Sequence, residues 1–556
     1  MPSRPSSPLI SSVAFIAVLL AGQLVFSLVW IGQADTPLGL YEIAGAQDIA
    51  SRLIGDWPGL LENLKAHTYY PPGYDMGLGL VLASGLDAPY AVLLFNWILA
   101  CIGCWGLIRL SGRPTGYWAA AIFSLLPSVC LSMRVSGREF VLTCLLPPFL
   151  AAVSRSQGLT NRRSSVEAAL WLTAAMYVKW TFIGMAVIPA VAYLAASGRP
   201  FNQELKRRAI NLAVGAAICL GLCAPWYIGV LDYHGIAFAT VNDPSDLPGL
   251  QGLIYYPKVL FDTHLLWWGC IACAAALPLA LWRNPKQAIP AAFWIAGPIV
   301  VFSLLVHKEA RYIQPVVPAC AAIIALGLGA LPKVRITRPI VGALILVLGA
   351  SSFVQDSYYR PIIMRDSGTR LELSSLGCLA LSKDIAAWLD EVVTEHSPEG
   401  TAAKAVLHPL SRNDIYMGQE VLSYRLSTEE RKAQEPWSVE VYNHERLGEF
   451  ICAFPEIRLL LVPDQLSNTT LDTQDSMARG WLSEQDPRLE GLIDWDDPAL
   501  LAEVQRSMQP VSKFVSDCVY ADDCNTAGIT LYKRVNPSPD PPAECGLGLL
   551  KVPRTL

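Results

Sequence analysis

The sequence predicts a mainly α-helical membrane protein: a polytopic bundle of about eleven transmembrane helices, followed by an extracytoplasmic α/β domain. Hydrophobic residues make up 53% of the 556 residues, a share that is high for an ordinary soluble protein. They come in long blocks, and a spanning helix needs roughly 20 mostly apolar residues. Acidic residues crowd the C-terminal third of the chain, whereas basic residues punctuate the hydrophobic part.

The first apolar block, from Pro5 to Ala34, contains no Asp, Glu, Lys or Arg. It follows Arg4, as the core of a signal peptide could, but it is longer than such a core and has no small-x-small cleavage site. We therefore interpret it as a retained first helix. The expected spans are 9–31, 88–108, 114–133, 140–154, 168–178, 180–197, 209–231, 265–282, 288–306, 312–332 and 339–355.

Lys and Arg residues mark the cytoplasmic loops of membrane proteins. Here they gather at 109–113, 155–163, 199–208, 283–286 and 333–338. With these clusters inside, the N-terminus is cytoplasmic, and 168–197 forms a hairpin whose tip near Lys179 points outward. The segments expected outside are the first loop 32–87, the loops 134–139, 232–264 and 307–311, and the tail. The expected location is the inner membrane of a bacterium, with the tail in the periplasm.

The expected domains are a transmembrane module at 1–355 and a periplasmic α/β domain at 356–556. The tail contains strand-like runs and a helix-like run. Disulfides persist in oxidising compartments, and Cys518 with Cys524 is the favoured pair, with free thiols as the alternative. The strand-like runs lie at 403–408, 458–462 and 528–535, and the helix-like run lies at 381–393.

Ionisable residues at membrane depth are costly and are functional candidates by default. On the expected outer side the chain offers carboxylates in the first loop and several cations, among them Arg134, in the later ones. This combination suits a reaction on a phosphorylated lipid, because cations hold the phosphate while a carboxylate deprotonates the acceptor. The sequence has no metal-ligand spacing, nucleophile elbow, P-loop or nucleic-acid-binding footprint. We therefore expect no metal and no cofactor.

Five short segments carry a resemblance through their order along the chain. They are QADTPLGLYE at 33–42, YYPPGY at 69–74, YVKWTF at 177–182, APWYIGVLDYHG at 224–235 and HKEARYIQPVVPACAAIIALGL at 307–328. Together they resemble the polytopic GT-C glycosyltransferases, in particular family 39, with its protein O-mannosyltransferases and aminoarabinose-transferase-like enzymes, which use polyprenyl-phosphate sugars. Two features depart from the pattern. Thr36 follows Asp35 where many relatives carry an Asp-Glu pair, and SGRE stands at 136–139 where relatives often have an Asp.

The resemblance implies that Asp35 is the base that deprotonates the acceptor, with Glu42 as a second candidate. Seven residues separate the two, so on a helix they would share a face. The residues expected to bind the donor phosphate are Lys179, Lys308, Arg311 and Tyr312. Possible pocket residues are Asp48, Tyr69, Tyr70, Arg138, Glu139 and His307. Structural roles are the alternatives, such as a helix-capping Asp35, a snorkelling Lys179, or Arg138 paired with Glu139.

The expected activity is transfer of a hexose or pentose from an undecaprenyl- or dolichyl-phosphate carrier to an extracytoplasmic lipid, glycan or protein, with inversion and without a metal. The expected partners are this donor, the acceptor and membrane lipids, with no nucleic acid. Two alternatives stay open. A lipid or sugar transporter should show internal repeats or paired broken helices, and no convincing repeat is visible. A non-catalytic scaffold or receptor that displays the tail should tolerate replacement of Asp35 and Arg311.

Overall fold

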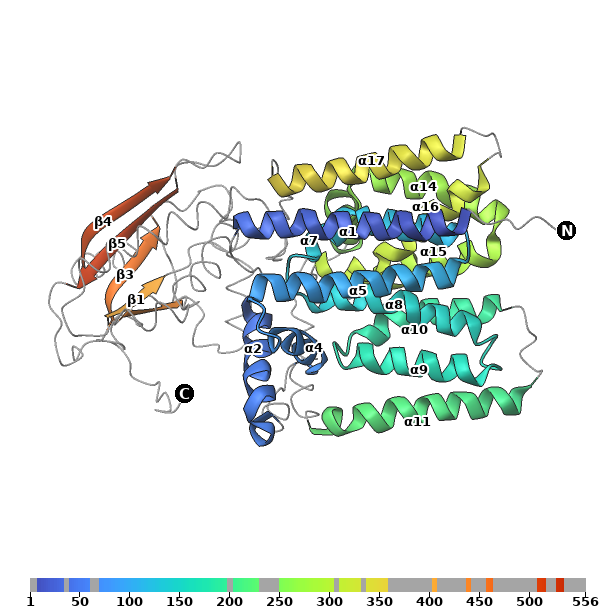
Figure 1. Ribbon diagram of the computed structural model, residues 1–556, viewed down its shortest axis with the longest axis horizontal. Helices are drawn as coiled ribbons and strands as arrows, with labels where there is room; N and C mark the ends of the chain where they lie inside the picture. The colour runs from blue at the N-terminus through green and yellow to red at the C-terminus, as the bar shows by residue number, and fades with distance from the viewer. Residues whose placement is uncertain are drawn as a thin grey trace. The chain divides into compact units, whose positions relative to one another are not determined.

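The computed structural model describes residues 8–34, 40–60, 70–197, 204–229, 250–304, 310–331 and 337–358, and five strands of the tail. Contacts divide the chain into two units, Met1–Leu376 and Gly377–Leu556. The described part of the first unit consists of helices and short turns (Figure 1). The helices are α1 (Pro8–Ala34), α2 (Leu40–Gly55), α4 (Gly73–Leu82), α5 (Ala88–Ser111), α6 (Thr115–Leu125), α7 (Pro127–Ser132), α8 (Arg138–Arg155), α9 (Arg162–Met176), α10 (Phe182–Ala196), α11 (Leu205–Gly229), α13 (Leu250–Val259), the π-helix η1 (Leu260–His264), α14 (Leu266–Arg283), α15 (Pro285–Leu304), the 3-10 helix η2 (Ala310–Val316), α16 (Val317–Ala330) and α17 (Thr337–Tyr358).

Helices occupy every stretch that the sequence predicted to span the membrane. Among the described residues, seven helices are long and apolar enough to cross a membrane, and α10 is apolar but shorter. The chain is therefore an integral, multi-pass membrane protein, whereas the number of eleven spans stays a prediction. The seven candidate spans are Val13–Gly32, Ala88–Ser111, Leu205–Ile228, Leu266–Arg283, Pro285–Leu304, Arg311–Ala330 and Thr337–Gln355.

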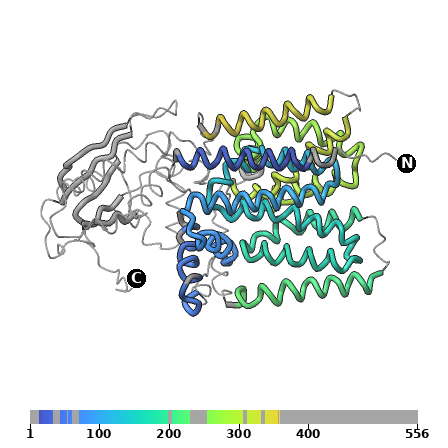
Figure 2. The backbone as a smooth tube through the Cα atoms, viewed as in Figure 1, coloured from blue at the N-terminus to red at the C-terminus, as the bar shows by residue number. Residues whose placement is uncertain are grey.

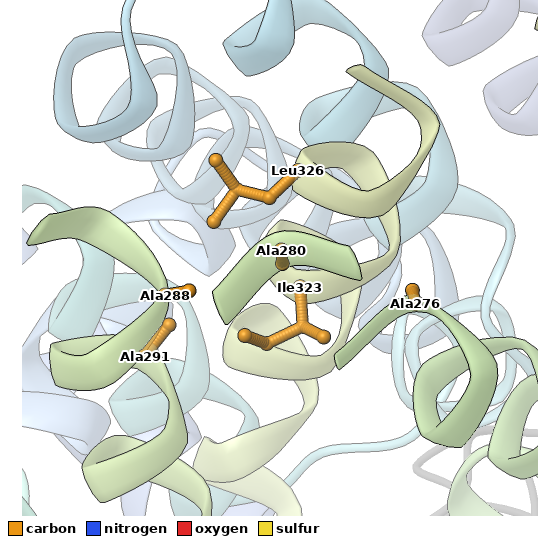
Figure 3. Packing of buried hydrophobic residues seen from close by; sticks show 6 residues of the cluster. All are labelled: Ala276, Ala280, Ala288, Ala291, Ile323 and Leu326. Carbon is orange, nitrogen blue, oxygen red and sulfur yellow. The ribbon is translucent and has the colours of Figure 1, made fainter. Parts of the chain in front are cut away.

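Helices α14, α15 and α16 pack closely because small side chains line their contacts. A side chain at Gly327 of α16 would meet the Ala276 side chain of α14 at 2.5 Å. In lipid, where the hydrophobic effect does not drive helices together, such close packing supplies the van der Waals attraction. The span that contains α16 is 89% buried, so α16 is a central helix of the bundle. Figure 3 shows the cluster of Ala276, Ala280, Ala288, Ala291, Ile323 and Leu326.

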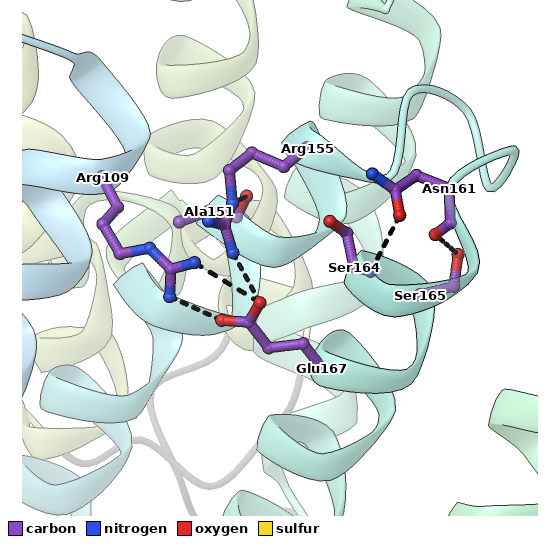
Figure 4. Close-up of polar contacts among 7 residues, drawn as sticks. All are labelled: Arg109, Ala151, Arg155, Asn161, Ser164, Ser165 and Glu167. Carbon is purple, nitrogen blue, oxygen red and sulfur yellow. Dashed lines mark hydrogen bonds and ion pairs between the residues drawn. The ribbon is translucent and has the colours of Figure 1, made fainter.

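One end of the bundle is held together by ion pairs around Glu167 of α9 (Figure 4). Its two carboxylate oxygens lie 2.5 Å from Arg109 Nη1 of α5 and 2.5 Å from Arg155 Nη2 of α8. Nearby, Asn161 caps α9, because its side-chain oxygen accepts a hydrogen bond from the backbone N–H of Ser164. Both arginines belong to clusters that the sequence predicted to be cytoplasmic.

Helix α2 lies across the opposite end of the bundle, crosswise to α1, α5 and α11, and packs against α4 (Figure 1). The backbone trace shows the neighbouring layer, in which α11 packs against α9 and α9 against α8 (Figure 2). At this end the chain enters α8 and turns between α9 and α10. Segments that are far apart in the sequence therefore meet there.

The described part of the second unit is a five-stranded sheet in the order β2-β1-β3-β5-β4. Strand β1 is parallel to β2 and β3, and β5 is antiparallel to β3 and β4. Pro510 lies in edge strand β4 beside a shift of register, and sheets confine proline, which lacks an N–H, to such positions. The strands are β1 (Ala403–Leu407), β2 (Trp437–Val441), β3 (Ile457–Pro463), β4 (Met508–Ser516) and β5 (Ala527–Arg534).

Strands β1, β3 and β5 form at the three runs that the sequence predicted. Strands β2 and β4 were not predicted. The helix expected at 381–393, and both Cys518 and Cys524, lie outside the described residues. The α/β class of the tail and its disulfide therefore stay predictions.

Candidate functional site

Five charged residues from four separate segments meet at the α2 end of the bundle. We call them the charged cluster. Asp75 lies in the first turn of α4, Arg138 and Glu139 begin α8, Lys179 lies in the turn between α9 and α10, and Arg311 lies in η2. Their ion pairs connect α4 to α8, and α8 to the α9–α10 turn and to η2.

Glu139 is the carboxylate that two cations share. Its Oε1 lies 2.5 Å from Nζ of Lys179 and 3.4 Å from Nε of Arg311. The side chains of Lys179 and Glu139 are only 4% and 5% exposed, whereas that of Arg311 is 29% exposed. Of the two cations, Arg311 is therefore the more accessible to a ligand at the bundle end.

Arg138 pairs with Asp75, across from α8 to α4. Its Nη2 lies 3.1 Å from each carboxylate oxygen of Asp75, and both side chains are buried. The sequence suggested an alternative in which Arg138 pairs with its neighbour Glu139. In the ion pairs described here, Arg138 pairs with Asp75 and Glu139 pairs with Lys179 and Arg311. Each residue pairs with a different segment, so the start of α8 is fixed on two sides.

Two tyrosine rings lie beside the charged cluster. The Tyr70 ring centroid lies 4.5 Å from the guanidinium carbon of Arg138 and 5.1 Å from Nζ of Lys179. The Tyr312 ring centroid lies 5.1 Å from the same Nζ. Cations over aromatic faces within about 6 Å are attracted by the ring quadrupole, more strongly where water is excluded. The rings therefore help to stabilise the Lys179 and Arg138 side chains inside the protein.

A close backbone contact places the first loop beside this cluster. The N–H of Gly73 donates to the carbonyl oxygen of Tyr177 at 2.8 Å, and a Cβ at Gly73 would lie only 2.6 Å from that oxygen. Glycine is the residue that permits this approach. The next residue, Tyr74, accepts a hydrogen bond on its hydroxyl oxygen from the N–H of Gly137, just before α8. The segment YPPGYD is thereby attached to both the α9–α10 turn and the start of α8.

Buried hydrogen bonds hold η2, and with it Arg311, in place. The side-chain amide of Gln314 donates to Oγ of Ser132 at 2.6 Å and to the carbonyl oxygen of Ser128 at 3.4 Å, both in α7. On the other side, the indole N–H of Trp294 donates to the carbonyl oxygen of Pro315 at 2.9 Å. The segment that carries Arg311 and Tyr312 is therefore fixed between α7 and α15.

The structure brings together six of the residues that the sequence singled out as site candidates: Tyr70, Arg138, Glu139, Lys179, Arg311 and Tyr312. It places Asp48 elsewhere, in an ion pair with Arg52 one turn further along α2 at 3.0 Å. Glu42 lies in α2, and nothing is described of its side chain. Asp35, Tyr69, His307 and Lys308 lie outside the described residues.

Three residues of the site were not predicted from the sequence: Asp75, Tyr74 and Gln314. Asp75 carries a recognisable signal, because it is an isolated carboxylate in the apolar segment GYDMGLGLVL directly after a Pro-Pro-Gly turn. Tyr74 and Gln314 carry none, because a tyrosine or a glutamine near a helix end is common in any membrane protein.

Chemically, the charged cluster is suited to an anion. Among the described residues it contains three cations and two carboxylates, with a formal charge of +1. An arginine presents a planar fork of donors that matches the geometry of phosphate oxygens.

The fold is similar to that of solved membrane glycosyltransferases. A crystal structure of ArnT from Cupriavidus metallidurans bound to undecaprenyl phosphate matches with a TM-score of 0.51 and 16% sequence identity, over 93% of this chain and 98% of that chain. Its apo structure matches with a TM-score of 0.52 and 15% identity, over 94% and 98%. A cryo-EM structure of the arabinofuranosyltransferase AftD from Mycobacteria gives a TM-score of 0.46 at 16% identity, over 96% of this chain and 42% of that chain.

The sequence of residues 128–360 matches the model of the Alg9-like mannosyltransferase family. No curated protein matches the chain in sequence. The likeness to ArnT shows that the chain has the GT-C fold, as the sequence resemblance implied. The family number differs from the expected one, because the matching model is that of family 22 and not family 39.

Proposed function

We propose that this protein is a membrane glycosyltransferase that moves a sugar from a polyprenyl-phosphate donor to an acceptor on the extracytoplasmic side of a bacterial inner membrane. The GT-C fold, the undecaprenyl phosphate bound in one ArnT structure and the match to a mannosyltransferase family support it. The observation that carries the proposal is the sharing of Glu139 between buried Lys179 and partly exposed Arg311 at one end of the bundle.

In this proposal Lys179 and Arg311 stabilise the donor phosphate. When the bond between the anomeric carbon and the phosphate oxygen breaks, the leaving polyprenyl phosphate takes the electron pair and gains negative charge. Preorganised cations in a site with little water stabilise such developing charge strongly. Tyr312 and Lys308 are proposed to assist. Because cations neutralise the leaving group, the proposed reaction needs no metal.

The proposed base is Asp35, one residue beyond the end of α1. It takes the proton of the acceptor hydroxyl or amine as that group attacks the anomeric carbon from the side opposite the phosphate, so the configuration inverts. Glu42 is the second candidate for this role. The donor panel below distinguishes a hexose from a pentose.

The test is turnover by the full chain in nanodiscs with a panel of radiolabelled polyprenyl-phosphate hexoses and pentoses, with membrane extract as the source of acceptor. We expect wild type to release polyprenyl phosphate from at least one donor, and Asp35→Asn to bind that donor without releasing it. Asp56→Asn is the matched control, because Asp56 is an exposed carboxylate of the same loop that pairs with Arg52.

Each outcome of this test decides a separate point. Equal release by Asp35→Asn would move the role of base to Glu42, Asp48 or Glu139. If wild type neither bound nor turned over any donor, the transferase proposal would be refuted, and the scaffold or transporter would replace it.

A further inference from the structure

Arg134, in the turn between α7 and α8, is enclosed by aromatic rings. Its guanidinium carbon lies 4.6 Å from the centroid of the Trp30 ring and 4.7 Å from that of Phe353. Arg134 is 2% exposed, and its Nη2 donates a hydrogen bond to Oγ of Ser357 at 2.6 Å. The indole N–H of Trp30 donates to the carbonyl oxygen of the same serine at 3.1 Å. We call these four residues the arginine joint.

The arginine joint connects three parts of the bundle near their ends. Trp30 belongs to the last turns of α1, and Phe353 and Ser357 belong to the last turns of α17. Arg134 is followed after four residues by the start of α8. Ser357 Oγ also donates to the carbonyl oxygen of Phe353 at 2.6 Å, so the serine is oriented to accept from the guanidinium.

Each part of the arginine joint is close in sequence to another segment of interest. Five residues after Trp30 comes Asp35, the proposed base. Five residues after Arg134 comes Glu139, which holds Lys179 and Arg311. From Ser357 the chain continues toward the second unit, which begins at Gly377. The end of α1 and the approach to α8 therefore meet the end of α17 at one guanidinium.

An arginine can fix the orientation of these helix ends better than an apolar side chain can. An apolar side chain of similar volume would fill the space without the cost of burying a charge. Arginine instead presents a planar surface that stacks on aromatic rings, together with donors at its edge that fix direction. Such a group specifies the relative orientation of three helix ends.

We propose that Arg134 is a positioning residue that fixes the exit of α1 relative to the start of α8 and links both to the exit of α17. Its consequence for turnover rests on the proposed function, because it acts through the placement of Asp35 relative to Glu139 and Lys179. It explains why a buried charge lies among aromatic rings at these helix ends.

The test compares the full chain in nanodiscs as wild type, Arg134→Met, Ser357→Ala and Trp30→Phe. The last two each remove one hydrogen-bonding group and keep the packing, so they remain informative if Arg134→Met folds poorly. Arg109→Met is the matched control, because Arg109 also stacks on an indole, that of Trp105 at 4.2 Å, but lies at the opposite end. Two quantities are measured: kcat and KM for the donor, and hydrogen exchange of peptides that contain Trp30, Ser357 or Arg109.

We expect the joint variants to lower kcat by about tenfold or more, because a small misplacement of reacting groups has effects of that size. KM for the donor should rise by less, because the ion pairs of Lys179 and Arg311 with Glu139 are not removed by these substitutions. Exchange should rise in the peptides with Trp30 and Ser357 and stay constant in the peptide with Arg109. In the Arg109→Met control, kcat should stay constant.

The proposal is overturned if exchange stays constant at both helix exits, or if exchange rises while kcat stays constant. A wild type that turns over no donor would refute the proposed function instead. The exchange data alone would then test the positioning role of Arg134. A rise in exchange at both helix exits would support that role, and constant exchange would overturn it.

Discussion

Nζ of Lys179 lies 2.5 Å from Oε1 of Glu139, and this contact joins two residues that are forty positions apart in the sequence. Both side chains are almost completely buried. Burying either charge alone would be costly, so the pair makes it possible for a lysine to lie at the tip of the α9–α10 hairpin inside the protein. The pair also supports Arg311, which approaches the same oxygen.

Removing one partner of this pair should destabilise the protein more than removing both. Lys179→Met removes the shorter of the two cation contacts of the buried Glu139 given above, and Glu139→Leu removes the carboxylate that pairs with Lys179. Breaking a buried pair typically costs about 3 kcal/mol or more, whereas an apolar replacement of both is often neutral. Thermal unfolding in detergent should rank the double variant above both single variants. Single variants as stable as wild type would contradict the buried pair.

The double variant Lys179→Met/Glu139→Leu should nevertheless lose turnover, because a cation proposed to bind phosphate is gone. Release of polyprenyl phosphate by this variant in nanodiscs measures the turnover. Turnover equal to that of wild type would show that Lys179 does not belong to the proposed site.

Gly73→Ala should separate the first loop from the α9–α10 turn. The new Cβ would lie 2.6 Å from the carbonyl oxygen of Tyr177, which cannot move without breaking the hydrogen bond from the Gly73 N–H. We expect a loss of about 1–3 kcal/mol in stability, as for other overpacked sites, and weaker donor binding. Gly22→Ala is the control, because a Cβ there would meet no atom of another described segment within 4 Å. Equal unfolding temperatures for the two variants would show that the contact is not tight.

Gln314→Leu should loosen η2 from α7. The substitution leaves Oγ of Ser132 and the carbonyl oxygen of Ser128 without this donor in a buried place, at a cost of about 1–3 kcal/mol. Because Arg311 is three residues away in the same helix, KM for the donor should rise as well. Steady-state kinetics over a range of donor concentrations measures it. An unchanged KM in a folded variant would show that Arg311 is placed without Gln314.

Asp75→Asn should disturb the start of α8. The amide has one oxygen where the carboxylate accepts from Arg138 Nη2 on two, and it leaves a buried guanidinium without its counter-charge. We expect lower stability than for Asp56→Asn, whose carboxylate is exposed. Fluorescence-detected thermal unfolding of the two variants makes the comparison. If Asp56→Asn were the less stable one, the buried pair would not contribute as described.

The helices of the bundle could be predicted from the sequence, because the apolar blocks that form them can be recognised residue by residue. In lipid every backbone group must be satisfied within its own segment, so each apolar block, such as that of α1 or α16, forms a helix. The number of spans is harder to predict, because some helices are interrupted. Helix α8 begins with Arg138 and Glu139, and α6 ends before Pro127. Length and composition alone do not decide whether such interrupted segments cross the membrane.

Four of the five residues of the charged cluster were candidates from the sequence, all but Asp75, whereas their ion pairs could not be predicted. Lys179 and Arg311 stood out because charges in apolar surroundings are costly. Glu139 was also a candidate, but its pairing with these two cations was not predicted, because pairing across forty residues depends on how helices pack and not on spacing. For the same reason Arg138 was weighed as a partner of its neighbour Glu139, whereas it pairs with Asp75 of α4.

The most direct measurement of the central claim is the affinity for undecaprenyl phosphate itself, measured by native mass spectrometry in wild type, Arg311→Gln, Arg311→Lys and Arg109→Gln. Loss of one charged hydrogen-bonding group at a phosphate should raise Kd by about tenfold or more. We predict this rise for Arg311→Gln, a smaller rise for Arg311→Lys, and no change for Arg109→Gln at the opposite end. Equal affinity in Arg311→Gln and wild type, or an equal loss in Arg109→Gln, would contradict a lipid-phosphate site at the charged cluster.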